Sequence, residues 1–182
     1  MFVKDFSDEY QKYRAMAEKA MAQVSDDALN EIPVAEGNSI AMIARHVGGN
    51  LSSRFTDFLT ADGEKPWRDR DGEFADGPFT RAGVERTWAK GFDVLVSELG
   101  KLSDADLTKT VTIRGTALTV HEALCRSLAH AASHVGQIVL LSKIAAGKNW
   151  KTLTIPKGKS ADYNKDPKVE KANAFTDNLK RR

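Results

Sequence analysis

Cysteine is nearly absent from this 182-residue chain, which contains only Cys125. A single cysteine excludes an intrachain disulfide framework and the cysteine-based classes of zinc site. Long apolar runs are missing too, so the sequence offers no transmembrane helix. The first ten residues, MFVKDFSDEY, lack the apolar core of a signal peptide. Together these absences predict a cytoplasmic protein that has no membrane partner.

A strong charge imbalance is also missing, because 27 Lys and Arg residues against 25 Asp and Glu residues leave a net charge of +2. The charge is unevenly distributed: residues 147–182 carry ten basic and four acidic side chains, and residues 1–146 carry 17 and 21. A nucleic-acid-binding face would need basic residues clustered on folded structure. We therefore expect no nucleic-acid partner, and we interpret the basic end as a solvated terminus or an interaction arm.

Apolar residues recur at helical spacing in four long segments. The predicted helices cover residues 6–24, 39–59, 80–99 and 119–146. The last of them starts with a capping box made by Thr119 and Glu122. Just before it, residues 109–118 are rich in β-forming residues, and Arg114-Gly115 suits the turn of a short hairpin. This pattern predicts an all-α fold, a four-helix bundle with a short extended segment before its last helix.

The predicted second and third helices are joined by a long connection, residues 60–79, which is rich in Gly, Pro and Asp. A loop of this length in a compact domain is usually functional or packed on itself, and Trp67, Phe74 and Phe79 are expected to anchor it. Gly48-Gly49, within the second helix, permits either a close approach of another helix or a kink.

The predicted domain organisation is simple. A chain of this length makes one ordinary domain. We assign residues 1–146 to the bundle and residues 147–182 to a basic C-terminal tail that packs on the bundle or extends from it.

Two histidines spaced as H-x-x-x-H, His130 and His134, lie in the otherwise apolar fourth helix. Residues four apart share one face of a helix, so two imidazoles placed in this way can bind one metal ion. His46, in the middle of the second helix, can complete the set because bundles build metal sites from facing helices. Three histidines and an open fourth position are typical of a catalytic metal site. Zinc suits three imidazoles, and nickel, iron and copper also accept them. The alternative is a set of ordinary core or surface histidines.

The remaining polar candidates are weaker. His121 is at the start of the fourth helix, on the face opposite His130, and is expected to be an exposed or capping residue. Gln137 shares the face of His130, where it either orients a ligand ring or lies at the bundle rim. Cys125 is interpreted as a small buried core thiol. No Ser–His–Asp order, phosphate-binding glycine loop or carboxylate pair is visible.

These features resemble the DinB/YfiT-like superfamily, specifically a branch known only as a domain of unknown function. The resemblance is carried by residues 39–70 (SIAMIARHVGGNLSSRFTDFLTADGEKPWRDR), 121–138 (HEALCRSLAHAASHVGQI) and 150–160 (WKTLTIPKGKS). It implies a bundle with a divalent metal ion, zinc or nickel, held by His46, His130 and His134, and a homodimer. It also implies metal-dependent S-transferase or isomerase chemistry with a low-molecular-weight thiol such as bacillithiol, mycothiol or glutathione.

Three hypotheses about function follow. The first is an enzyme, a metal-dependent thiol S-transferase that acts on a small electrophile. In that case Trp67, Arg68 and Arg70 of the long connection line or cover the site, unless the two arginines form ordinary surface ion pairs. The second is a non-enzymatic metal-binding or stress-response dimerisation module. The third is a metal-free helical interaction protein.

Overall fold

The computed structural model describes residues 1–167 and 169–181, which are mostly helical with one small antiparallel sheet. The four long helices are α1 (Phe2–Met21), α3 (Ile40–Phe55), α5 (Arg81–Leu99) and α6 (Val120–Ala146). The four short helices are α2 (Asp26–Asn30), α4 (Arg70–Glu73), α7 (Ser160–Asn164) and α8 (Ala172–Arg181). Two 3-10 turns cover Asp104–Thr108 and Gly147–Asn149, and the strands are β1 (Thr110–Ile113) and β2 (Thr116–Thr119). The predominantly helical fold predicted from the sequence is confirmed.

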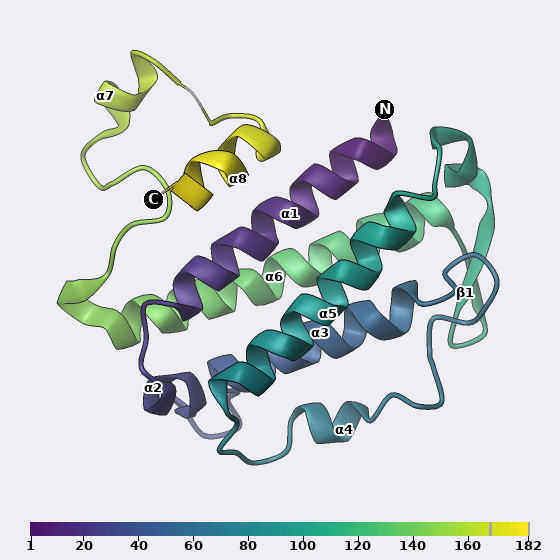
Figure 1. The fold of residues 1–182 in the computed structure, drawn as a ribbon, viewed down its shortest axis with the longest axis horizontal. Coiled ribbons are helices and arrows are strands. Elements are labelled where there is room, and N and C mark those ends of the chain that lie inside the picture. The colour runs from purple at the N-terminus through teal and green to yellow at the C-terminus, as the bar shows by residue number, and fades with distance from the viewer. Residues whose placement is uncertain (168, 182) are drawn as a thin grey trace.

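The long helices pack around one apolar core (Figure 1). α1 contacts α5 and α6, and α3 also contacts α5 and α6. Tyr10 of α1 is fully buried and its hydroxyl donates to the Leu124 carbonyl of α6 at 3.3 Å. No helix in the described part of the chain is both long and apolar enough to cross a membrane.

Helix boundaries differ from the prediction mainly at α1 and α3. α1 begins at Phe2 and ends at Met21, earlier at both ends than the predicted 6–24. α3 ends at Phe55, and not near Leu59, because Thr56 is extended and Asp57 takes a left-handed φ of 50°. The capping box of Thr119 and Glu122 is present at the start of α6, as predicted.

Of the two alternatives at Gly48-Gly49, a close helix approach or a kink, the structure has the close approach, between α3 and α5. A Cβ on Gly48 would lie 2.4 Å from the carbonyl oxygen of Thr87, and one on Gly91 would lie 2.4 Å from that of Gly48. The atoms in the way belong to helix backbones, which cannot shift without a large cost in packing energy. Both glycines therefore let the two helices touch main chain to main chain while α3 continues unbroken.

The hairpin also matches its prediction. β1 pairs with β2, with Ile113 opposite Thr116. The turn residues Arg114 and Gly115 have φ of 55° and 73°, the left-handed pair of a type I′ turn. Asp62 holds this turn because its carboxylate accepts hydrogen bonds from the backbone amides of Arg114 and Gly115, both at 2.8 Å. The backbone amide of Glu64, which donates to Asp62 at 2.7 Å, and the amides of Gly115 and Arg114 hold the pKa of Asp62 well below its usual range. The hydrogen bonds from Arg114 and Gly115 tie the long connection to the hairpin.

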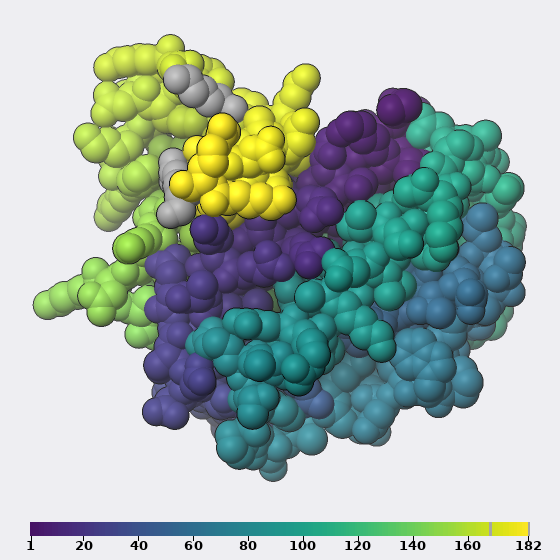
Figure 2. Space-filling view, viewed as in Figure 1, coloured from purple at the N-terminus to yellow at the C-terminus, as the bar shows by residue number. Residues whose placement is uncertain are grey.

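The C-terminal region folds back on the molecule. α8 packs against α1 (Figure 1) and buries Thr176 and Leu179. In the space-filling view, the chain beyond α6 forms a yellow-green to yellow lobe beside α1 (Figure 2). The end of the chain therefore contributes to the core as well as carrying basic side chains.

Candidate metal centre

Three histidines from two helices converge inside the molecule. His46 projects from the middle of α3, and His130 and His134 project from α6 one turn apart. The Nε2 atoms of His46 and His130 are 3.2 Å apart, and one ligand nitrogen from each ring lies within 4.8 Å of the others. His46 is buried and the other two are half-buried. The structure thus brings together the three histidines that the sequence singled out.

A buried carboxylate fixes the orientation of His46. Nδ1 of His46 lies 2.9 Å from Oε2 of Glu73, the last residue of α4. Because the pKa of Glu73 is held below its usual range, the carboxylate is ionised and Nδ1 must donate. In a neutral ring this leaves the Nε2 lone pair of His46 free and directed at the other histidines.

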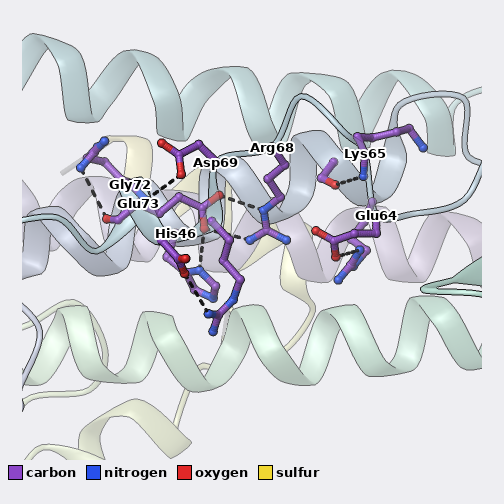
Figure 3. A network of polar contacts seen from close by, with 12 residues as sticks. His46, Glu64, Lys65, Arg68, Asp69, Gly72 and Glu73 are labelled. Carbon is purple, nitrogen blue, oxygen red and sulfur yellow. Dashed lines mark hydrogen bonds and ion pairs between the residues drawn. The ribbon is translucent and has the colours of Figure 1, made fainter.

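Glu73 is itself held by an arginine. Arg68 donates from Nε and from a terminal nitrogen to the two oxygens of Glu73, both at 2.9 Å (Figure 3). Burial alone would raise the pKa of Glu73, but the hydrogen bonds from His46 and Arg68 lower it. Gly49 leaves the space, since a Cβ there would lie 2.1 Å from Oε1 of Glu73. Arg68, Glu73 and His46 therefore form one connected chain of charge-assisted hydrogen bonds.

The α6 histidines are set differently. Nδ1 of His134 lies 2.9 Å from Oε1 of Gln137, which can only accept, so Nδ1 donates and Nε2 is free. Gln137 is thus the ring-orienting partner that the sequence offered as one of two interpretations. Nδ1 of His130 is buried and has no hydrogen-bond partner among the described residues. Phe74 packs on the His46 ring with centroids 4.7 Å apart.

Burial keeps the α6 histidines neutral. It lowers the pKa of His130 to about 4, and the nearby His134 and His46 add to the effect. Burial also lowers the pKa of His134, against the hydrogen bond to Gln137, which raises it. At neutral pH the lone pairs of both rings are therefore not blocked by protons.

The donor set fits a divalent transition metal. Three imidazole nitrogens, two of them in tautomers fixed by Glu73 and Gln137, are the arrangement that zinc, nickel or copper prefers. Magnesium and calcium prefer oxygen ligands, and the carboxylate of Glu73 is already committed to His46 and Arg68. The orphaned Nδ1 of His130 is the one imperfection in this hydrogen-bond arrangement.

A pocket of about 180 Å³ opens beside the histidines. His46 and His130 are among its lining residues, so the cluster is reached from this pocket and is not sealed in the core. The lining also includes five arginines and the apolar side chains Phe55, Phe58 and Ile113. An open site next to a pocket is the arrangement of a site that handles a small molecule.

The other residues predicted for the site fall in different places. Arg68 and Arg70 both line the pocket, whereas Trp67 does not line it and is 56% exposed, contrary to its predicted role as a buried anchor. His121 is exposed at the start of α6, as predicted. Cys125 is exposed as well, so its interpretation as a buried core thiol is wrong. Its Sγ lies 3.6 Å from Nε2 of His121, on the outward face of α6.

Glu73 is the functional residue that sequence reasoning missed. It lies 27 residues after His46, in a loop whose four-residue helix has no periodic pattern. The only local signal was Gly49, one helical turn after His46, which clears space for a side chain from elsewhere.

Comparison with known families gives one match. The family model described as "Protein of unknown function (DUF1572)" matches residues 1–159, which include all three histidines and Glu73. No curated protein and no solved structure matches the chain.

Proposed function

The chain belongs to the DUF1572 family, a family of unknown function, and we propose that it is a cytoplasmic divalent-metal-binding protein of the DinB/YfiT-like superfamily. In this proposal the four long helices are the DinB-like four-helix bundle, and His46, His130 and His134 hold one zinc or nickel ion. The observation that carries the proposal is the convergence of the three ring nitrogens within 4.8 Å.

The site supports an enzyme better than a storage or structural role, because His46 and His130 face a pocket. We infer a metal-dependent thiol S-transferase that acts on a small electrophile; the thiol cosubstrate follows from the DinB/YfiT resemblance of the sequence. A divalent ion in such a site supplies Lewis acidity that favours the thiolate form of a thiol at neutral pH.

The protein's own groups would do the positioning. Glu73 holds His46 in one tautomer, and Gln137 does the same for His134. Phe74 packs against the His46 ring and covers that side of it. The reactants would reach His46 and His130 through the pocket that these two residues and the arginines line. Electrostatic preorganisation needs groups that are fixed in place. The rings of His46 and His134 are each held by a hydrogen-bond partner.

The resemblance further implies a homodimer, which we include in the proposal. Sedimentation of the purified protein across micromolar concentrations tests it, with a mass of twice 20.0 kDa as the expected result. A monomer at all concentrations would remove the dimer from the proposal and leave the metal site unaffected.

The experiment that tests the enzymatic function is a thiol-consumption assay. The zinc- or nickel-loaded protein is mixed with a model electrophile, 1-chloro-2,4-dinitrobenzene, and with glutathione, bacillithiol or mycothiol in turn. We expect turnover with at least one thiol, at least a hundredfold reduced in His130→Ala and unchanged in His121→Ala. A metal-loaded protein inactive with every thiol would contradict the transferase and favour the non-enzymatic module.

A further inference from the structure

The pocket beside the histidines is lined by an unusual concentration of arginines. These are Arg54, Arg68, Arg70, Arg114 and Arg126, and no acidic residue is among the lining residues. They come from four separate parts of the chain: α3, the long connection with α4, the hairpin turn, and α6. The fold therefore gathers positive charge at one place in a molecule whose net charge is only +2.

Three of the five guanidinium groups already have carboxylate partners outside the lining of the pocket. Arg68 is paired with Glu73 at 2.9 Å, and Glu64 accepts from both Arg54 at 3.1 Å and Arg114 at 2.8 Å. Two carboxylates thus serve three arginines. The pKa of Arg54 is lowered by burial, and the positive charges of Arg68 and Arg114 lower it further.

The other two arginines have no comparable partner. The side chain of Arg126 is exposed and makes no ion pair or hydrogen bond with any residue that the structure describes. Arg70 has an ion pair of 4.0 Å with its neighbour Asp71, whose side chain is fully exposed to solvent. A contact of that kind contributes little. Arg70 also lies over the Phe74 ring, with its guanidinium carbon 5.4 Å from the ring centroid. Arg70 and Arg126 can therefore turn toward a ligand without breaking a buried ion pair.

The shape of the pocket decides what kind of anion it suits. A volume of about 180 Å³ is close to that of a cavity of about 150 Å³ that holds benzene, which suits a small molecule and not a polymer. The guanidinium fork matches the two oxygens of a carboxylate or a phosphate. The apolar residues Phe55, Phe58 and Ile113 offer contact to a carbon skeleton.

We propose that this arginine-lined pocket binds a small organic anion by its carboxylate or phosphate group, chiefly through Arg70 and Arg126. The opposite end of the bound molecule then faces His46 and His130, which line the same pocket. The role of this anion as the substrate rests on the proposed function. Its binding in the pocket does not depend on that function.

Calorimetric titration tests the binding directly. Inorganic phosphate and succinate are titrated into metal-free and zinc-loaded protein at low ionic strength, with uncharged succinamide as the ligand control. The variants are Arg70→Gln, Arg126→Gln and the double variant. Arg86→Gln is the matched control, because Arg86 is exposed on α5 and lies outside the pocket. The metal-free arm is needed because anions also bind divalent ions.

We expect at least one anion to bind the wild type in both metal states, and succinamide not to bind. The double variant should weaken this binding at least tenfold, while Arg86→Gln changes it less than twofold. The tighter of the two anions identifies the recognised group as phosphate or carboxylate. The proposal is overturned if neither anion binds in either metal state, or if Arg86→Gln weakens binding as much as the double variant.

Zinc titrations of the same samples separate this proposal from the metal site. Zinc binding without arginine-dependent anion binding overturns the pocket inference and leaves the metal site standing. Arginine-dependent anion binding without zinc binding supports the pocket and contradicts the proposed function.

Discussion

At the scale of single residues, the candidate site depends on a carboxylate, that of Glu73, which does not line the pocket. Glu73 accepts from Nδ1 of His46 and from two nitrogens of Arg68, all at 2.9 Å. Through the first bond it sets the tautomer of one ring of the candidate metal site, and the hydrogen bonds from His46 and Arg68 together keep it ionised. A histidine–carboxylate pair of this type raises the basicity of the ligand and fixes its direction.

Substitution Glu73→Gln is expected to lower zinc affinity by about ten- to a hundredfold, the usual range for a lost ligand-orienting partner. Gln keeps the size of the side chain and an acceptor oxygen for His46 but removes the charge that pairs with Arg68. Competition titration with a chromophoric chelator measures the affinity. Glu85→Gln, an exposed change on α5, is the control and should have no effect. Equal affinities for both variants would show that Glu73 is not a positioning residue.

The histidines could be predicted from the sequence, and their surroundings could not. Helical phase placed His130 with His134 and excluded His121, since it depends only on spacing along one helix. The partner Glu73 comes from a loop whose path has no periodic signal. Cys125 was misassigned from the usual burial of free cysteine, although the exposed side chains of His121, Glu122 and Arg126 mark the same side of α6 as outward.

At the scale of elements, the contact between α3 and α5 holds in place the helix α3, on which His46 lies. Gly48 of α3 and Gly91 of α5 let the two backbones meet. Gly49, the next residue of α3, faces the carboxylate of Glu73. One short stretch of α3 therefore serves both the helix pairing and the site. The glycines cost helix propensity, and the close packing they permit offsets that cost.

Substitution Gly91→Ala should reverse the usual effect of alanine in a helix. By propensity it would stabilise by about 1 kcal/mol, but the new Cβ would lie 2.4 Å from a backbone oxygen of α3. We expect a net loss of about 1–3 kcal/mol of unfolding free energy, the usual cost of overpacking. Gly136→Ala, in an exposed part of α6 with nothing within 4 Å of the new Cβ, is the control and should stabilise. Urea denaturation measures both, and stabilisation of the two variants alike would contradict the close approach.

The four long helices and the hairpin were predictable because each has a strong local signal. Apolar periodicity marked the helices, and the Thr119 capping box and the Arg114-Gly115 turn marked the start of α6 and the hairpin turn. The short helix α4 was not predictable, because its four residues are held by the cap of Asp69 and by the tertiary contacts of Glu73. Short elements of this kind follow from packing and not from pattern.

At the scale of the whole molecule, the C-terminal segment is joined to the core by α8. Leu179 is 2% exposed and belongs to the same apolar cluster as the buried residues of α1. The basic side chains of the predicted tail are carried by a segment that is partly anchored. The division of the chain at residue 146 remains a prediction.

Substitution Leu179→Ala should destabilise the whole protein by about 2–4 kcal/mol, the range for removing a buried leucine side chain. Lys180→Ala, at the exposed neighbouring position, should change stability by less than about 0.5 kcal/mol. Thermal or urea unfolding of the two variants provides the comparison. If Leu179→Ala is as stable as Lys180→Ala, α8 does not pack on α1 in solution.

Metal stoichiometry decides whether His46, His130 and His134 hold one divalent ion. Untagged wild-type protein and the variants His46→Ala, His130→Ala, His134→Ala and His121→Ala are loaded with zinc or nickel, desalted and assayed by elemental analysis. A three-histidine site predicts about one ion per chain in the wild type and in His121→Ala, and less than a tenth of that in the other three. A wild type that retains no ion after loading, or a His121→Ala variant that loses as much as the other three, would contradict it.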